Sequence, residues 1–269
     1  MTVGHDRWGG ATAYEAFMGR WSRKLAPMFV EWLGEPSGRS WVDVGCGTGA
    51  LSSAILARVR PTAILGVDPS EDFLTLARAN VDDPRVRFER GSAASMPVGD
   101  GWADAVVAGL VLNFVPDVGA ALTEMRRVGA PGAVIGAYVW DYGGEMQLIR
   151  RLFDAAISLD PGAEHHDEGK RFPICASGGL RSALESAGIG DVVDDAIEIP
   201  TVFRDFDDFW TPFLGGVGPA PAYVVSLEED ARVRLRERLR ATLPTETDGA
   251  IHLTARAWAA RGVVLRGPS

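Results

Sequence analysis

Apolar residues in the first half of the chain follow two alternating periods. Longer stretches with apolar residues three or four positions apart indicate amphipathic helices. The predicted helices cover residues 12–33, 51–59, 71–79 and 118–128. Short continuous apolar runs with the length of buried strands lie at residues 40–44, 63–67, 86–88, 103–108 and 133–140. This alternation predicts an α/β fold, a doubly wound parallel sheet with helices on both faces.

Local signals mark several helix ends in this half. Thr12 and Glu15 have capping-box spacing and predict that the first helix opens there, while Pro27 predicts a kink within it. Ser70 is placed to cap the helix that reaches Ala79.

The second half of the chain is less regular. Helices are expected at residues 145–159 and 180–187. The aromatic stretch 203–213 favours a core role over a pocket wall. We expect one domain over residues 1–269, with N-terminal helices at 12–33, a core at 40–140, cap insertions at about 141–175 and 203–247, and late strands at 192–199 and 251–257.

Residues 226–243 carry two competing patterns. Five arginines at alternate positions from 232 to 240 resemble a strand, whereas Leu235, Leu239 and Leu243 form a helical stripe. Ser226 and Glu229 have the spacing of a capping box, which favours a helix that opens at Ser226. The basic face of this helix is interpreted as solvated.

Composition narrows the class of protein. The chain has 269 residues, 46% apolar and 23% charged, with a formal net charge of −9 that argues against nucleic acid as the main partner. Cys46 and Cys175 are too few for a disulfide framework, and no metal site is expected. No apolar run reaches the length of a membrane span, and the first ten residues lack a signal-peptide core. We therefore expect a cytoplasmic protein, a monomer or homodimer, without a membrane partner.

A glycine-rich turn carries the strongest chemical signal. Gly45, Gly47 and Gly49 stand between a predicted strand and a predicted helix, where backbone amides can approach a ligand. With Ala50 in the third small position the turn also satisfies the dinucleotide-binding pattern, and Asp68 ends the next strand about 20 residues on. The motif alone admits two cofactors, a nicotinamide dinucleotide or S-adenosylmethionine.

The stretch from Val42 to Tyr142 resembles the class I S-adenosylmethionine-dependent methyltransferases of the small-molecule branch. This branch, methyltransferase type 11, includes the enzymes of ubiquinone and menaquinone biosynthesis. The matching features are Asp43 before the glycine turn, Asp68-Pro69-Ser70, the segment Gly91–Pro97, Asp104 at the fourth strand, Glu124 with Arg127 and Val128, and Pro131-Gly132. The resemblance implies a Rossmann-like seven-stranded methyltransferase sheet and makes dehydrogenase the minor alternative.

The resemblance also implies roles for individual residues. Asp43 with the turn Gly45, Cys46, Gly47 and Gly49 would hold the methionine moiety, Asp68 the ribose and Pro69 the adenine face. Ser92, where relatives carry aspartate, and Ala93 would meet the adenine edge. The further implied cofactor contacts are Gly109, Leu110, Tyr14 and Arg20, and the implied substrate-pocket residues are Asn113, Trp140, Tyr142 and Trp210.

The implied reaction is methyl transfer from S-adenosyl-L-methionine, with S-adenosyl-L-homocysteine as product, to an O, N, S or C nucleophile of a small molecule. No residue stands out as a general base, and the candidates are Asp141, His165 and His166. Two alternatives stay open: a nicotinamide-dependent oxidoreductase, and a noncatalytic protein that binds S-adenosylmethionine. Cys175 is interpreted as a buried apolar residue.

Overall fold

Seven strands form one mixed sheet in the order β3-β2-β1-β4-β5-β7-β6 in the computed structural model, which describes residues 10–265. Strands β1 to β5 pair in parallel, and β7 runs antiparallel to β5. The strands are β1 (Ser40–Val44), β2 (Ala63–Asp68), β3 (Val86–Arg90), β4 (Ala103–Gly109), β5 (Gly129–Trp140), β6 (Ile189–Phe203) and β7 (Ile251–Val264). The predicted α/β fold with a seven-stranded sheet is confirmed.

Helices alternate with the parallel strands as the hydrophobic periodicity predicts. The α-helices are α1 (Ala11–Tyr14), α2 (Arg20–Leu33), α3 (Ala50–Val59), α4 (Glu71–Asn80), α5 (Val118–Val128), α6 (Gln147–Leu159), α7 (Glu168–Arg171), α8 (Gly179–Ser186), α9 (Phe206–Trp210), α10 (Pro219–Ser226) and α11 (Glu229–Thr242). A π-helical turn, η1 (Glu15–Gly19), separates α1 from α2. None of the helices described has the length and apolar character that crossing a bilayer requires.

The chain divides into two compact units. The first, here called the sheet unit, contains residues 22–140, 174–197 and 257–265. The second, here called the aromatic unit, contains residues 10–21, 141–173 and 198–256. The aromatic unit therefore comprises the N-terminal segment, nearly all of the first predicted insertion (141–175) and the whole of the second (203–247). It also extends beyond the second insertion into the late strand, as far as Arg256. That the insertions act as a cap stays a prediction.

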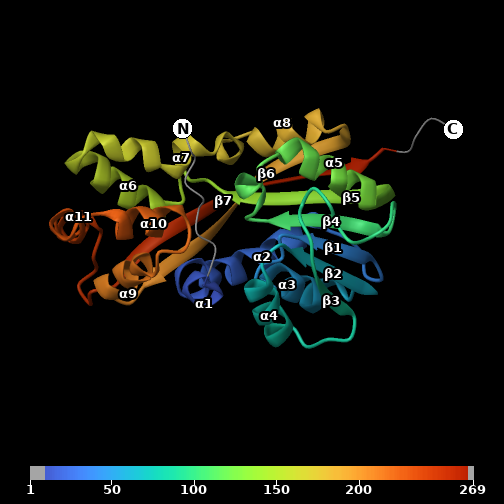
Figure 1. Cartoon of the computed structure of the whole chain (residues 1–269), viewed down its shortest axis with the longest axis horizontal. Helices are drawn as coiled ribbons and strands as arrows, with labels where there is room; N and C mark the ends of the chain where they lie inside the picture. The colour runs from blue at the N-terminus through green and yellow to red at the C-terminus, as the bar shows by residue number, and fades with distance from the viewer. Residues whose placement is uncertain (1–9, 266–269) are drawn as a thin grey trace. The chain divides into compact units, whose positions relative to one another are not determined.

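The sheet unit buries its parallel strands almost completely. Trp41, Val42 and Val44 of β1 have no exposed surface, as expected for a central strand covered on both faces. Helix α4 packs on β2 and β3, while α5 packs on β4 and β5 (Figure 1). The strand order reverses between β1 and β4, and ligands in open α/β sheets bind beyond the carboxyl ends of the strands at such a point.

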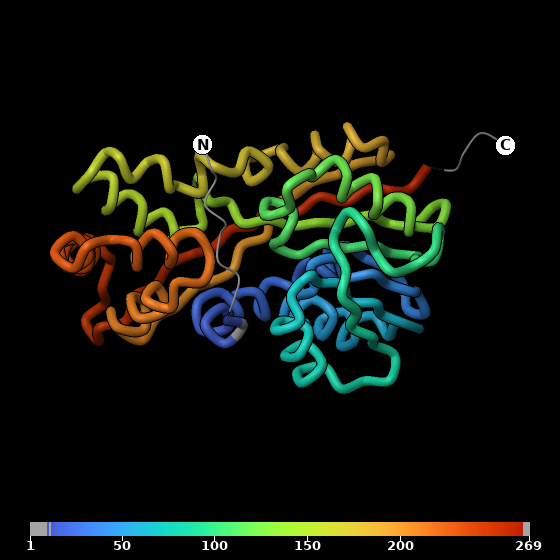
Figure 2. The backbone as a smooth tube through the Cα atoms, viewed as in Figure 1, coloured from blue at the N-terminus to red at the C-terminus, as the bar shows by residue number. Residues whose placement is uncertain are grey.

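An aromatic cluster forms the core of the aromatic unit. Phe17, Phe203, Phe209 and Phe213 are buried, and the rings of Phe17 and Phe213 lie 5.2 Å apart. Three phenylalanines of the stretch 203–213 are buried, as a core role requires, while the choice between core and pocket wall for the whole stretch stays a prediction. Helices α6 and α11, distant in sequence, lie side by side in this unit (Figure 2).

Two predicted helix caps are wrong. Ala13 N and Tyr14 N donate to Gly10 O, so the first helix begins before Thr12. Ser226 is the last residue of α10, and its hydroxyl donates to Tyr223 O at 2.7 Å instead of capping α11, whose N-cap is Glu228.

Six of the seven predicted strands are longer in the structure than in the sequence analysis, three of them by four residues or more. β5 begins at Gly129, β6 covers Ile189–Phe203 and β7 covers Ile251–Val264. Strand ends depend on ladder partners as well as on apolar runs, and β7 pairs with β5 as far as Val263. Pro27 lies within α2, which continues through it to Leu33.

Candidate functional site

The turn between β1 and α3 requires its glycines for backbone reasons. Gly45, Gly47 and Gly49 have φ values of 66°, 52° and 87°, in the left-handed region that side chains disfavour. A Cβ at Gly45 would also lie 2.4 Å from Val111 Cγ2. A Cβ at Gly47 would meet no described atom within 4 Å, so the main chain there borders open space.

Asp68 ends β2 beside this turn and is fixed by two backbone amides. Gly47 N donates to its Oδ2 at 3.0 Å, and Ser70 N donates to its Oδ1 at 2.9 Å. The side chain is buried, and burial raises its pKa. A carboxylate oxygen can accept about two hydrogen bonds, so each oxygen retains capacity for a hydroxyl group of a ligand.

Asp43 on β1 is a fully buried carboxyl group. Ser52 Oγ of α3 donates to its Oδ2 at 2.7 Å, whereas its Oδ1 is buried without a hydrogen-bond partner. Burial raises the pKa of Asp43 to about 7, and the negative charge of Asp68 acts in the same direction. An unpartnered buried acceptor beside a second carboxylate favours a cationic group in this region.

Cys46 occupies the turn but faces the protein interior. Its side chain belongs to a buried cluster with Leu74, Ala77, Val81 and Phe88. Its N–H donates to Val67 O at 3.1 Å, and its carbonyl accepts from Gly49 N at 2.9 Å. The observed role of Cys46 is therefore packing, and a contact with a cofactor stays a prediction.

The loop that follows β3 starts beside Asp68. Gly91 N donates to Asp68 O at 3.2 Å, and Ser92 and Ser95 exchange two backbone hydrogen bonds. Ser92 is exposed and Ala93 is half-buried, so neither is enclosed by the described protein. Pro69, predicted to cover the adenine face, is exposed next to Asp68.

The segment after β4 carries backbone strain. Leu110 has a φ of 60°, which is unusual for a non-glycine residue and characteristic of functional positions. Its N–H donates to Tyr138 O at 2.8 Å, and a Cβ at Gly109 would lie 2.6 Å from Tyr138 Oη. Asn113 in the following 3₁₀ turn is buried, with its Nδ2 lacking a hydrogen-bond partner.

Four predicted contact residues belong to the aromatic unit, whereas Trp140 is buried in the sheet unit. Arg20 donates to Asp208 Oδ1 at 3.0 Å. Tyr14 is half-buried and Tyr142 is buried. For all of these residues, a cofactor or substrate contact stays a prediction.

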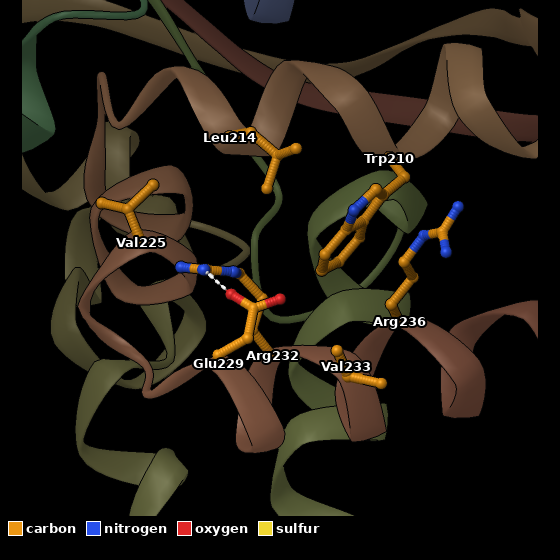
Figure 3. A pocket seen from close by; sticks show the side chains of 7 residues that line it. All are labelled: Trp210, Leu214, Val225, Glu229, Arg232, Val233 and Arg236. Carbon is orange, nitrogen blue, oxygen red and sulfur yellow. Dashed lines mark hydrogen bonds and ion pairs between the residues drawn. The ribbon is translucent and has the colours of Figure 1, made fainter.

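Trp210 lines a pocket of about 410 Å³ within the aromatic unit. Figure 3 shows its indole near Arg236 and Val233 of α11, with the Glu229–Arg232 ion pair along the same helix. The walls combine apolar side chains with two guanidinium groups, but both guanidinium groups already face carboxylates. Trp210 therefore borders a cavity, and its predicted place in the substrate pocket is not decided by this geometry.

The three candidates for a general base have different surroundings. Asp141 Oδ2 accepts from Arg256 Nη2 at 2.7 Å and from Glu145 N at 3.0 Å, which gives this carboxylate a structural role. His165 and His166 are exposed, and the ring of His166 lies 5.0 Å from that of Tyr223. All three belong to the aromatic unit, and a role as general base stays a prediction for each.

Two supporting contacts escape sequence reasoning. Ser52 anchors Asp43 across nine residues, and Glu124 Oε1 accepts from Met96 N at 2.7 Å. Ser52 lies in the first turn of α3, directly after the glycine motif, so its position in the sequence could have indicated a hydrogen bond to Asp43. Glu124 stands out in the sequence only as part of a family pattern, which gives no indication of its partner.

The first half of the chain matches a protein family described as "Methyltransferase domain" over residues 42–136. The chain is 32% identical over 188 residues to an uncharacterized 37.1 kDa protein in transposon TN4556 of Streptomyces fradiae, covering 68% of this chain and 52% of that protein. It is 34% identical over 107 residues to the 2-phytyl-1,4-naphtoquinone methyltransferase of Thermosynechococcus vestitus, covering 39% of this chain and 48% of that enzyme. The matches thus span about half the length of these relatives.

The fold is shared with solved methyltransferases. A structure of phosphoethanolamine N-methyltransferase 2 from Haemonchus contortus, in complex with S-adenosyl-L-methionine, superposes with a TM-score of 0.58 at 14% identity. The superposition covers 97% of this chain and 58% of that one, and identity this low supports the fold alone. Residues 42–136 therefore match the methyltransferase domain family, and the chain shares the fold of solved methyltransferases.

Proposed function

We propose that this chain transfers a methyl group from S-adenosyl-L-methionine to an O, N, S or C nucleophile of a small molecule. The observation that carries the proposal is the Asp68 carboxylate, held by Gly47 N and Ser70 N at the carboxyl end of β2. Vicinal ribose hydroxyls are the groups that such a carboxylate binds in nucleoside-binding folds. The family match over residues 42–136 selects the methyltransferase among such folds.

The chemistry of the residues present fits this cofactor. Asp68 retains acceptor capacity for two hydroxyl groups, and Asp43 Oδ1 is a buried acceptor that lacks a donor. The main chain at Gly47 borders open space, which permits close approach of a ligand. A carboxylate pair near a glycine turn suits a ligand with a cationic amine and a ribose.

Each part of the cofactor has residues assigned to it in this proposal. Asp43 and the glycine turn hold the amino and carboxylate groups of the methionine moiety, and Asp68 holds the ribose. Pro69 covers one face of the adenine, with Ser92 and Ala93 at its edge. Gly109 and Leu110 border the ribose and the methyl end.

The bound cofactor supplies an electrophilic methyl group. The residues of the chain bind and orient the two reactants and exclude water, and orientation alone can lower a barrier by roughly 7–11 kcal/mol. Asp141 is an unsuitable proton acceptor because its Oδ2 already receives hydrogen bonds from Arg256 and Glu145. Proximity is therefore the main catalytic device.

The oxidoreductase alternative shares the ribose carboxylate but not the family match. The noncatalytic alternative retains the binding site and differs only in turnover. The Thermosynechococcus relative is named for a quinone substrate, but its match covers only 39% of this chain. We therefore do not assign that substrate to this chain.

Ligand-induced stabilisation tests the proposal directly. S-adenosyl-L-methionine and S-adenosyl-L-homocysteine are expected to raise the melting temperature, whereas NAD and NADP leave it unchanged. A ligand at 100 times its Kd stabilises the native state by about 2.7 kcal/mol. Stabilisation by NAD alone would contradict the assignment. Transfer of a labelled methyl group into a metabolite extract then separates an enzyme from a noncatalytic binder.

A further inference from the structure

The loop between β3 and β4 is anchored to the sheet unit at two places. At its start, Gly91 N donates to Asp68 O at 3.2 Å. Farther along, Met96 N donates to Glu124 Oε1 at 2.7 Å, and Val98 O accepts from Arg127 Nη2 at 3.0 Å. The first anchor belongs to the proposed ribose site and the second to helix α5.

The second anchor is a preorganised ion pair. Arg127 Nε donates to Glu124 Oε2 and its Nη2 to Oε1, both at 2.7 Å, which is the two-pronged geometry of an arginine fork. Arg127 Nη1 also donates to Asp100 Oδ1 at 2.5 Å. The guanidinium holds the pKa of Glu124 below its ordinary value, so the carboxylate stays ionised as the acceptor of Met96 N.

The loop makes few other hydrogen bonds. In the described part of the chain, residues 92–98 make hydrogen bonds to the rest of the protein only through Glu124 and Arg127. The pairs Ser92–Ser95 and Met96–Val98 are internal to the loop. The conformation of Ser92 and Ala93 therefore depends on two anchors, Gly91 on one side and the buried Met96 on the other.

We propose that Glu124 and Arg127 are positioning residues that hold the loop 91–98 in the conformation that reads the adenine base, without touching the cofactor. The inference rests on the proposed function, in which Ser92 and Ala93 meet the adenine edge. It predicts that loosening the anchor lowers both the affinity for the cofactor and the selectivity for its base.

Selectivity is measured by isothermal titration with two ligands, S-adenosyl-L-homocysteine and S-inosylhomocysteine. Hypoxanthine replaces the adenine amino group with a carbonyl and places a hydrogen on N1, so it reverses the hydrogen-bond pattern of the edge. Wild type is expected to prefer the adenosyl ligand. Glu124→Ala is expected to weaken the adenosyl ligand about tenfold, the lower part of the range for losing one buried hydrogen bond. The affinity for the inosyl ligand is expected to fall less, so the ratio of the two affinities decreases.

Two further variants serve as rescue and control. Glu124→Gln keeps an oxygen acceptor for Met96 N and is expected to stay within about threefold of wild type, because a neutral acceptor is weaker than a charged one. Glu31→Ala removes another glutamate–arginine pair of the same unit, Glu31 Oε1 to Arg58 Nη1 at 2.7 Å, which holds no loop. That variant is expected to match wild type with both ligands.

Several outcomes overturn the inference. They are a folded Glu124→Ala with wild-type affinity, equal weakening of both ligands, and a wild type without base preference. If Glu124→Ala fails to fold, Arg127→Lys is measured instead, because it keeps the charge but loses the guanidinium group that donates to Val98 O. An unchanged preference of this variant for the adenosyl over the inosyl ligand then overturns the inference. A wild type that binds neither ligand contradicts the proposed function instead.

Discussion

Four buried aspartates of the molecule have different partners in its two units. In the sheet unit, Asp43 and Asp68 are buried and make no ion pair in the described part of the chain. Their hydrogen-bond donors are Ser52 Oγ for the first and two backbone amides for the second. Burial raises the pKa of both groups.

In the aromatic unit two buried carboxylates, those of Asp141 and Asp167, are paired with arginines. Asp141 Oδ2 accepts from both Nε and Nη2 of Arg256, and Asp167 accepts from Nη1 of Arg150 at 3.0 Å with a second contact to Nη2 at 2.9 Å. Asp167 also caps α7 through Gly169 N. These carboxylates are compensated within the protein.

We infer from this difference that the paired carboxylates of the aromatic unit stabilise the fold, whereas the unpaired carboxylates of the sheet unit are available to bind a ligand. A paired buried charge is satisfied by the fold, and removing one partner leaves the other uncompensated. An unpaired buried carboxylate is costly in the ligand-free protein, and a cationic or hydroxyl-bearing ligand can offset that cost. The comparison predicts opposite effects of substitutions in the two units.

The largest effect is expected in the aromatic unit. Asp141→Ala leaves Arg256 without its closest partner and is expected to lower the free energy of unfolding by about 3–5 kcal/mol. Glu198→Gln removes only the exposed partner of the same arginine, at 3.6 Å, and serves as the control with little expected change. Urea denaturation of both variants measures the difference, and equal stabilities would show that the buried pair is not structural.

The next effect is a pH dependence in the sheet unit. The pKa of Asp43 is about 7 in the folded chain and near 3.8 when unfolded, so folding retains a proton between these values. Stability is therefore expected to fall as pH rises from about 4 to 7, by about 4 kcal/mol, and to stay level above. Asp43→Asn removes this contribution. Subtracting the pH profiles of the two proteins isolates it, and a flat difference would contradict the unpaired state of Asp43.

Loss of the ribose carboxylate is expected to act on binding. Asp68→Ala should weaken S-adenosyl-L-homocysteine by about 1–3 kcal/mol, because it removes an acceptor that the fold holds in place. Asp194→Ala, which removes a partner of Arg181 in the same unit, is the matched control. Titration calorimetry that gives Asp68→Ala the affinity of wild type would remove this residue from the site.

The smallest effect concerns the adenine edge. Ser92→Asp is expected to keep the affinity for S-adenosyl-L-homocysteine level or to tighten it by up to about 1 kcal/mol, through a charge-assisted bond to the adenine amine. Ser92 is exposed in the protein, so the substitution buries no new charge without ligand. A tenfold loss in the same titration would show that Ser92 faces another group.

The core elements could be predicted from local patterns. β1 and α5 have the predicted bounds, and Ser70 accepts from Phe73 N as the predicted cap of α4. The glycine turn and Asp68 could also be identified, because alternate glycines after a strand and an acidic residue at the end of the next strand are local sequence features. The three glycines do have positive φ values in the structure. Capping boxes were less reliable, since Ser226 has the required spacing but already ends α10.

The sequence by itself determined the order and type of the core elements and the residues of the glycine turn. These features depend on hydrophobic periodicity and backbone conformation within a few residues. Only the tertiary structure decided that Asp141 meets Arg256 across 115 residues, while Asp43 forms an ion pair with none of the residues from 10 to 265. It also decided that Glu124 holds Met96, 28 residues away. Counterions and loop anchors come from contacts that form when distant segments pack together, and local spacing does not encode them.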